Sequence, residues 1–221
     1  MHKTFLSTLL TLLGLALAGC SIGAGQVRGS GNVTTEQRDV SAFTAVDVSG
    51  IGEVVINQGN TESLTVETDD NIQRLVLSEV RDGTLHLDMQ PKTSLSNIPR
   101  LLFTVTVRDL KHITLSGAGK ISVRAFNSDQ LTIDNSGVGA LTASGTVREQ
   151  FVTLSGVGGY DGTALASERA TVTVSGIGDA MVNVRDRLDA TVSGVGSIEY
   201  SGNPEVHTQV SGVGEVRQRT P

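Results

Sequence analysis

The sequence predicts an all-β protein built as a parallel β-helix, or solenoid, with coils of 18–20 residues. Three observations support this fold. A Ser-Gly-x-Gly motif occurs seven times, its last six copies are spaced 18–20 residues apart, and aliphatic residues recur at fixed positions around it. A glycine-containing corner repeated with a period near twenty is typical of repeat proteins. The motif serines are Ser49, Ser116, Ser136, Ser155, Ser175, Ser193 and Ser211.

Four positions around each motif serine are apolar in nearly every repeat: three and one before it, and two and five after it. In the repeat at Ser175 they hold Val172, Val174, Ile177 and Ala180. Apolar residues two positions apart indicate a strand, because side chains alternate between its faces. The steps of three across the motif predict a corner, after which the chain resumes with its apolar face still inward. Glycine suits such corners because it tolerates unusual backbone angles and close neighbours.

An antiparallel β-sandwich or barrel with glycine turns is the alternative fold. Antiparallel hairpins relate strands in pairs and produce mirrored patterns, whereas this sequence copies one register at a nearly constant period. The parallel solenoid is therefore favoured, and its coils are expected to lie about 4.8 Å apart. Under this prediction Val152, Val172 and Ala190 stack on one another inside the coil.

Residues 1–19 resemble a lipoprotein signal peptide. The apolar run from Phe5 to Ala18 is shorter than the about 20 residues that a membrane-spanning helix needs. It ends in Leu-Ala-Gly-Cys, which looks like a lipobox and predicts lipid attachment at Cys20, the only cysteine. An ordinary secretory signal with an incidental cysteine is the alternative. Ser21 after the cysteine resembles cargo sent to an outer membrane, so we expect a lipid-anchored protein of the cell envelope at that membrane.

The mature chain divides into three parts by composition. Residues 20–37 are rich in glycine and polar residues and are expected to form a flexible tether. Residues 38–115 form an irregular N-terminal β part, which caps the first regular coil and protects its open edge. Residues 116–221 form the regular β-solenoid coils. Within the irregular part, alternation predicts strands at 43–48, 53–58, 63–68, 75–80, 84–89 and 101–107, a helical turn near 72–75 and a loop over 91–99.

Several segments resemble one known family. Gly52–Gly59, Val66–Asn71 and Asp82–Leu85, together with the recurring Ser-Gly-x-Gly corners, are similar to the putative auto-transporter adhesin head GIN domain family over roughly residues 40–217. The resemblance implies a β-helical, adhesin-like envelope domain of unestablished biochemical function, carried on secreted proteins or lipoproteins. It brings no catalytic residues with it.

The charge of the chain limits its partners. A formal net charge of −6 argues against nucleic acid, which binds to basic surfaces. The expected partners are the membrane, through a lipidated Cys20, and a glycan or an envelope protein. No cofactor, metal or catalytic residue is predicted.

The seven motif serines are the first candidate binding feature. Stacked along one corner, their hydroxyls form a ladder that could hydrogen-bond a repetitive ligand such as a glycan. The simpler interpretation, which we favour, is structural: serine in a tight turn bonds nearby backbone amides. Asn135 replaces an aliphatic residue one position before Ser136, and we expect its amide to bond the adjacent turn rather than line a polar site.

Other polar residues give weaker signals. His86 and Asp88 lie on the same face of a strand, but a third metal ligand is not evident. His112 and His207 have no sequence neighbours that suggest catalysis. The position four after the motif serine holds Glu53, Asp179 and Glu215, but Lys120, Ala140, Gly159 and Ser197 interrupt the row.

The sequence therefore predicts a lipid-anchored binding, adhesin-like or structural module without catalysis. The alternative is a polysaccharide-degrading β-helix enzyme that uses carboxylates clustered across coils. Aromatic platforms for sugar stacking are few, since Tyr160 and Tyr200 are the only tyrosines and tryptophan is absent. This scarcity disfavours the enzyme.

Overall fold

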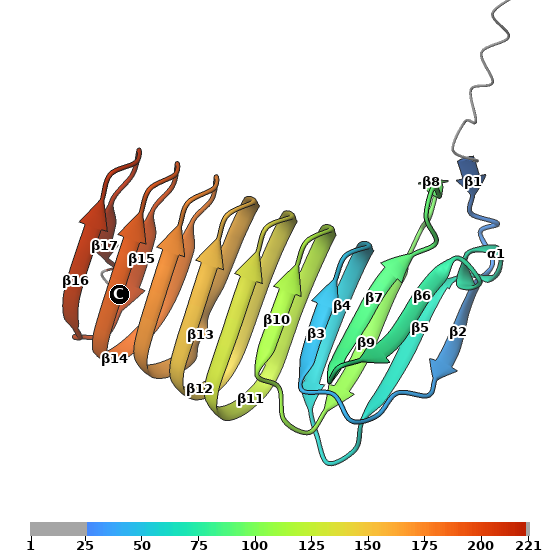
Figure 1. The fold of residues 1–221 in the computed structure, drawn as a ribbon, viewed down its shortest axis with the longest axis horizontal. Helices are drawn as coiled ribbons and strands as arrows, with labels where there is room; N and C mark the ends of the chain where they lie inside the picture. Colours follow the sequence, from blue (N-terminus) through green and yellow to red (C-terminus); the bar gives the residue numbers. More distant parts are fainter. Residues whose placement is uncertain (1–25, 220–221) are drawn as a thin grey trace, which may run out of the picture.

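The computed structural model describes residues 26–219, which form one elongated stack of strands (Figure 1). The predicted signal peptide and Cys20 lie outside the described residues. About 70% of the structure is strand, and the solenoid has about five turns. The predicted all-β parallel solenoid is confirmed. Helices long and apolar enough to cross a membrane are absent from the described part of the chain.

The regular coils are made of long strands that pair in parallel with the next coil. In Figure 1 each long strand starts at one long edge of the stack, turns at the opposite edge and returns. We call the edge that holds the Ser-Gly-x-Gly motifs the corner edge, and the other the bend edge. The coil strands are β11 (Ala118–Asn135), β12 (Val138–Leu154), β13 (Val157–Val174), β14 (Ala180–Val192), β15 (Ile198–Ser201), β16 (Glu205–Val210) and β17 (Val216–Gln218).

The apolar columns stack in register as the sequence predicts. Val152 pairs with Val172, and Val172 pairs with Ala190. Each of the three is at most 2% exposed. Every coil thus lays its aliphatic side chains on those of the coil below, and burial grows with each neighbour.

The N-terminal part continues the stack and closes its end. Ser49 joins two strands that pair in parallel with the first regular coil, β3 (Ala45–Val48) with β10 (His112–Leu115) and β4 (Ile51–Gln58) with β11. Parallel pairing then gives way to antiparallel pairing between β5 and β9 and between β6 and β7. The remaining elements are β5 (Ser63–Asp69), α1 (Asp70–Gln73), β6 (Val76–Arg81), β7 (Thr84–Met89), β8 (Ser94–Ser96) and β9 (Leu101–Val107).

The structure corrects the boundary of the tether. Residues 26–37, which the sequence assigns to a flexible segment, carry β1 (Gln26–Arg28) and most of β2 (Val33–Arg38). β1 pairs in parallel with β8, which lies inside the predicted loop over 91–99, and β2 pairs antiparallel with β5. These strands have no hydrophobic alternation of their own, and partners far along the chain define them.

The column two residues after the motif serine also departs from expectation. The sequence suggests that its aliphatic residues face inward, but in the structure they point to solvent from the corner edge. Six of them are 40–71% exposed, and the seventh, Ala118, is exposed as well. The outward row, which we call the aliphatic ridge, consists of Ile51, Ala118, Val138, Val157, Ile177, Val195 and Val213.

Backbone-to-backbone contact between coils explains the glycines of the corner. The N–H groups of Ser175 and Gly176 both donate to the carbonyl of Leu154, at 2.8 and 3.0 Å, and Ile177 N donates to Gly156 O at 2.9 Å. A Cβ atom built on Gly176 would lie 2.1 Å from Gly156 O. No side chain fits there, so the first motif glycine is required for the coils to approach.

One chain of polar side chains crosses the apolar interior. The Tyr160 hydroxyl donates to Gln150 Oε1 at 3.0 Å, and Gln150 Nε2 donates to Ser167 Oγ at 2.8 Å. The Ser167 hydroxyl in turn donates to Asn183 O at 2.8 Å. Gln150 is fully buried and Tyr160 is 1% exposed, so these groups satisfy one another without water. This row of hydrogen-bonded polar groups, which we call the buried polar chain, connects β12, β13 and β14, which belong to three successive coils.

Replacing Gly176 by alanine tests the corner contact. The new Cβ must push two coils apart, so Gly176→Ala is expected to lower the free energy of unfolding by about 1–3 kcal/mol or more, as overpacking does. Gly83→Ala is the control, because a Cβ at Gly83 meets nothing within 4 Å although φ is +74°. Its backbone strain should cost only about 1 kcal/mol. Equal losses in chemical denaturation would contradict the contact.

Replacing Tyr160 by phenylalanine tests the buried polar chain. Tyr160→Phe leaves the Gln150 oxygen without a donor, which should cost about 1–3 kcal/mol in denaturation. Tyr200→Phe is the control, because Tyr200 is only half-buried, and it should cost clearly less.

The pH dependence of stability gives a second readout. Burial, and then the charge of Asp161, raise the pKa of Tyr160 above its ordinary value. An unfolded tyrosine loses its proton near pH 10, whereas the folded residue retains it. This contribution to stability is therefore complete below about pH 10 and is lost as the pH rises further. The alkaline loss of stability should be smaller in Tyr160→Phe than in the wild type.

Candidate functional site

A polar depression lies on the bend edge and spans four coils. Its volume is about 680 Å³. It contains the middle portions of β11, β12 and β13 and the part of β14 paired with them. We call it the polar groove, and the residues that characterise it are Asn127, Asp129, Thr146, Arg148, Glu168 and Arg185.

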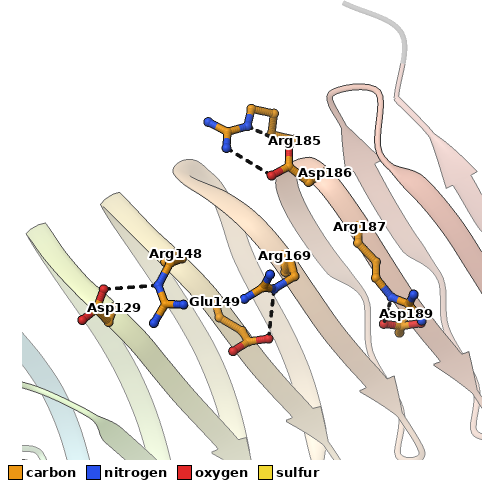
Figure 2. A network of polar contacts seen from close by, with 8 residues as sticks. All are labelled: Asp129, Arg148, Glu149, Arg169, Arg185, Asp186, Arg187 and Asp189. Carbon is orange, nitrogen blue, oxygen red and sulfur yellow. Dashed lines mark hydrogen bonds and ion pairs between the residues drawn. The ribbon is translucent and has the colours of Figure 1, made fainter.

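Charges of opposite sign alternate from coil to coil in the groove. Arg148 Nε lies 3.3 Å from Asp129 Oδ1, one coil away, and Arg185 Nη2 lies 3.3 Å from Glu168 Oε1. Figure 2 shows the first of these pairs, and it shows Arg185 turned toward Asp186, which it also binds at 2.8 Å. The row thus presents carboxylate and guanidinium groups in turn, at the spacing of the coils.

A second row of charges runs beside the first. Arg169 Nε lies 3.3 Å from Glu149 Oε1, and Arg187 Nε lies 2.8 Å from Asp189 Oδ2 (Figure 2). The hydrogen bond from Arg187 holds the pKa of Asp189 below its usual range, and that from Arg185 does the same for Asp186. These acids stay ionised at neutral pH, so the row remains a set of fixed charges.

The floor of the groove rests on the buried polar chain. Ser167 and Asn183 line the groove and are also the last members of the chain that begins at Tyr160. At the mouth, Thr146 Oγ1 donates to Asn127 Oδ1 at 3.3 Å. The groove is therefore rigid at its base and has adaptable side chains at its surface.

This arrangement suits binding better than acid–base catalysis. Ion pairs exposed to water are weak, so their guanidinium and carboxylate groups can exchange partners with a ligand. A glycosidase needs one carboxylic acid whose pKa is raised. The carboxyl groups with a clear pKa shift in the described chain, Asp70, Asp186 and Asp189, all have it lowered. The polysaccharide-degrading alternative is accordingly not favoured.

The seven motif serines lie at the opposite edge from the groove. All are exposed, and the residues that flank them pair in register from coil to coil. The corner amides bond to carbonyls of the coil below, so the backbone satisfies them without the serine hydroxyls. Ser155 Oγ instead donates to Asn135 O at 3.3 Å. We expected the serine hydroxyls to bond the corner amides, but backbone carbonyls of the neighbouring coil bond them instead.

The structure shows why Asn135 is tolerated among aliphatic residues. It is 1% exposed, Gly137 N donates to its Oδ1 at 3.1 Å, and its Nδ2 donates to Gly139 O at 3.4 Å. The predicted bonding to the adjacent turn is confirmed.

The three histidines of the described residues each lie close to an acid on a strand surface. His86 Nδ1 is 3.0 Å from Asp47 Oδ2, His112 Nε2 is 2.7 Å from Asp134 Oδ2, and His207 Nε2 is 3.1 Å from Glu205 Oε1. Asp88 accepts the N–H of Met89 rather than joining His86. Within residues 26–219 no three His, Cys, Asp or Glu side chains gather to hold a metal ion.

The residues four after the motif serine also remain separate. Asp179 Oδ1 accepts the N–H of Ser197 at 2.7 Å, and Glu215 pairs with Arg217 at 2.8 Å. Glu53 lies in β4, next to Lys120 in the register of β11. Asp179 thus links two successive coils, and the three acids form no carboxylate cluster among the described residues.

The groove residues were not predicted from the sequence. The bend that positions them varies in length, and the register shifts at Val123/Phe126, at Thr142/Ser144 and twice between β13 and β14. One signal could have found them: Asp129, Arg148 and Glu168 alternate in charge at intervals of 19 and 20 residues.

Comparison with solved structures places the fold among bacterial adhesin-like proteins. A putative adhesin from Bacteroides fragilis NCTC 9343 matches with a TM-score of 0.73 and 25% identity, over 87% of this chain and 100% of that one. A putative lipid binding protein from Parabacteroides distasonis ATCC 8503 matches with a TM-score of 0.58 and 18% identity, over 89% and 100%. The second likeness shows the fold alone.

Sequence comparison identifies the family. No match is found among the curated proteins. The family model described as "Putative auto-transporter adhesin, head GIN domain" matches residues 42–204, which is most of the chain and includes the first six motif corners. The resemblance seen in the sequence is thus confirmed, and the chain belongs to the family of the putative auto-transporter adhesin head GIN domain.

Proposed function

We propose that this protein is a lipid-anchored adhesin-like module of the cell envelope that binds a polar polymer, a glycan, in the polar groove. The observation that carries the proposal is the row of alternating charged and amide side chains on a rigid edge of the solenoid. Such groups supply both donors and acceptors, which the hydroxyls of a saccharide require. The adhesin-like family and the structural relatives support a role at the cell surface.

The repeat of the groove favours a polymer over a small ligand. Each coil adds its polar groups about 4.8 Å from those of the coil below, so the same contacts recur along the stack. A chain of sugar units can meet several coils at once, and the contacts then act together. The groove spans four coils, and four such sets of contacts are available to one ligand.

The groove is tested by removing its two guanidinium groups. Arg148→Ala/Arg185→Ala is expected to weaken binding to envelope polysaccharide at least about tenfold, or about 1.4 kcal/mol. Binding to an array of bacterial glycans, followed by titration of the best one, measures this change. The matched control, Arg81→Ala/Arg108→Ala, removes the same charge from the N-terminal part and should bind as the wild type does.

Each result of this comparison is informative. Equal weakening by both double variants would mean that the charge of the whole protein acts and the groove does not. Glycan binding that neither variant changes would move the site elsewhere on the solenoid. Absence of glycan binding by the wild type would overturn the proposal.

The anchor is tested at Cys20. Cys20→Ser removes the thiol that would carry the lipid, so the protein should leave the membrane fraction and appear in the soluble fraction. Two or three acyl chains bind membranes firmly, at about 0.8 kcal/mol per buried CH₂, so the shift should be nearly complete. Ser7→Ala, a change within the apolar leader run, is the control and should leave the protein at the membrane. A membrane-bound Cys20→Ser protein would contradict the anchor.

A further inference from the structure

The aliphatic ridge holds most of the strongly exposed large hydrophobic residues of the described chain. Among the described residues, nine large hydrophobic side chains are strongly exposed. Six of them belong to the ridge: Ile51, Val138, Val157, Ile177, Val195 and Val213. With Ala118 they form one straight row along the corner edge. Seven residues separated by about 4.8 Å make a row about 29 Å long. A continuous apolar row of this kind marks an interaction surface, whereas scattered exposed residues do not.

The motifs that carry the ridge contain no charged residue, and most of their backbone N–H groups are bonded within the protein. Every motif consists of Ser, Gly and an aliphatic residue, so no charge lies in the corners themselves. Most corner N–H groups bond to carbonyls of neighbouring coils, as Ile177 N does to Gly156 O at 2.9 Å and Gly178 N does to Val195 O at 3.0 Å. Backbone N–H groups that are bonded internally lose little when a surface leaves water for an apolar medium, and most N–H groups of this edge are bonded in this way.

The start of the described chain lies beside one end of the ridge. Val27 of β1 pairs with Leu95 of β8, and Leu95 lines a cavity together with Ile51 and Ala118, the first two ridge residues. In Figure 1, β1 and β8 stand at the corner edge of the stack, at the end opposite β17. Cys20 is six residues before Gln26, a reach of at most about 20 Å. A lipid on Cys20 would therefore bring the bilayer to the edge that carries the ridge.

We infer that the aliphatic ridge lies on the lipid bilayer, and that the solenoid rests along its corner edge with the polar groove facing away. This inference rests on the proposed lipid anchor and adds an orientation to it. The residues four after the motif serine include three acids, Glu53, Asp179 and Glu215, and one base, Lys120. This excess of negative charge favours zwitterionic lipids over anionic ones. The aliphatic side chains enter the boundary between headgroups and acyl chains, as the apolar face of an interfacial element does.

A second copy of the chain fits the ridge less well. The ridge is one side chain wide, whereas a stable interface between proteins buries about 800 Å² on each partner. A row about 29 Å long and one residue wide offers much less area than that. The bilayer needs no matching partner surface, and the anchor adds its own binding to that of the ridge.

The test labels the ridge of the full-length protein purified from membranes. Val157→Cys places a thiol on the ridge, and Thr146→Cys places one at the polar groove as the matched control. The free thiol is coupled to an environment-sensitive fluorophore. The wild type, whose Cys20 thiol would be occupied by the lipid, is treated in the same way and measures background labelling. The protein is incorporated into phosphatidylcholine vesicles, recovered by flotation and exposed to lipids that carry a quencher near the headgroups.

If the ridge lies on the bilayer, we expect a blue-shifted emission and quenching by the lipids at position 157, and neither change at position 146. An interfacial residue lies about 5–10 Å into the boundary, within reach of such a quencher. The triple change Val138→Thr/Ile177→Thr/Val195→Thr replaces exposed residues by a similar shape and should reduce quenching at position 157 while flotation persists.

Three outcomes would overturn the inference. Flotation without quenching at position 157 refutes the orientation and leaves the anchor standing. A blue shift at position 157 without lipid quenching means that a second copy covers the ridge. Protein that does not float refutes both the orientation and the anchor.

Discussion

Successive glycine corners lie so close together that their backbones touch, and this contact determines how the coils stack. At the corner edge the backbone of one coil lies directly on that of the next, with no room for a Cβ atom at Gly176. The same contact fixes the register of each coil, because the corner amides find their carbonyls one coil below. Once the register is fixed, Val152, Val172 and Ala190 stack on one another, and their side chains fill the interior.

The two long edges of the solenoid differ in structure and in the side chains that they expose. The corner edge has little freedom, since backbone contacts determine its shape. The outward residues of its motifs are serines and aliphatic residues, all uncharged. The bend edge carries bulges, charged side chains and the polar groove. The buried chain from Tyr160 through Gln150 to Ser167 links the interior to the groove floor, so that ordering of the core is transmitted to the surface where a ligand would bind.

The regular coils could be predicted because their spacing is written in the sequence. Val172 and Val174 alternate as a strand demands, and the copies of this pattern show that the coils are parallel. The direction of Ile177 could not be predicted, because a step of three residues reveals a corner without its backbone angles. The strands at Gln26–Arg28 and Val33–Arg38 were missed because pairing with distant segments creates them. The groove was missed because the bend edge changes length from coil to coil.

That change of length has a consequence for how such a protein can vary. The intervals between corners from Ser116 onward are 20, 19, 20, 18 and 18 residues, and the register shifts that absorb the differences all fall between one corner and the next. Insertions and deletions are thus accommodated away from the glycines. A solenoid of this design can acquire a new recognition surface by gaining or losing single residues at its bends, while its stacking remains intact.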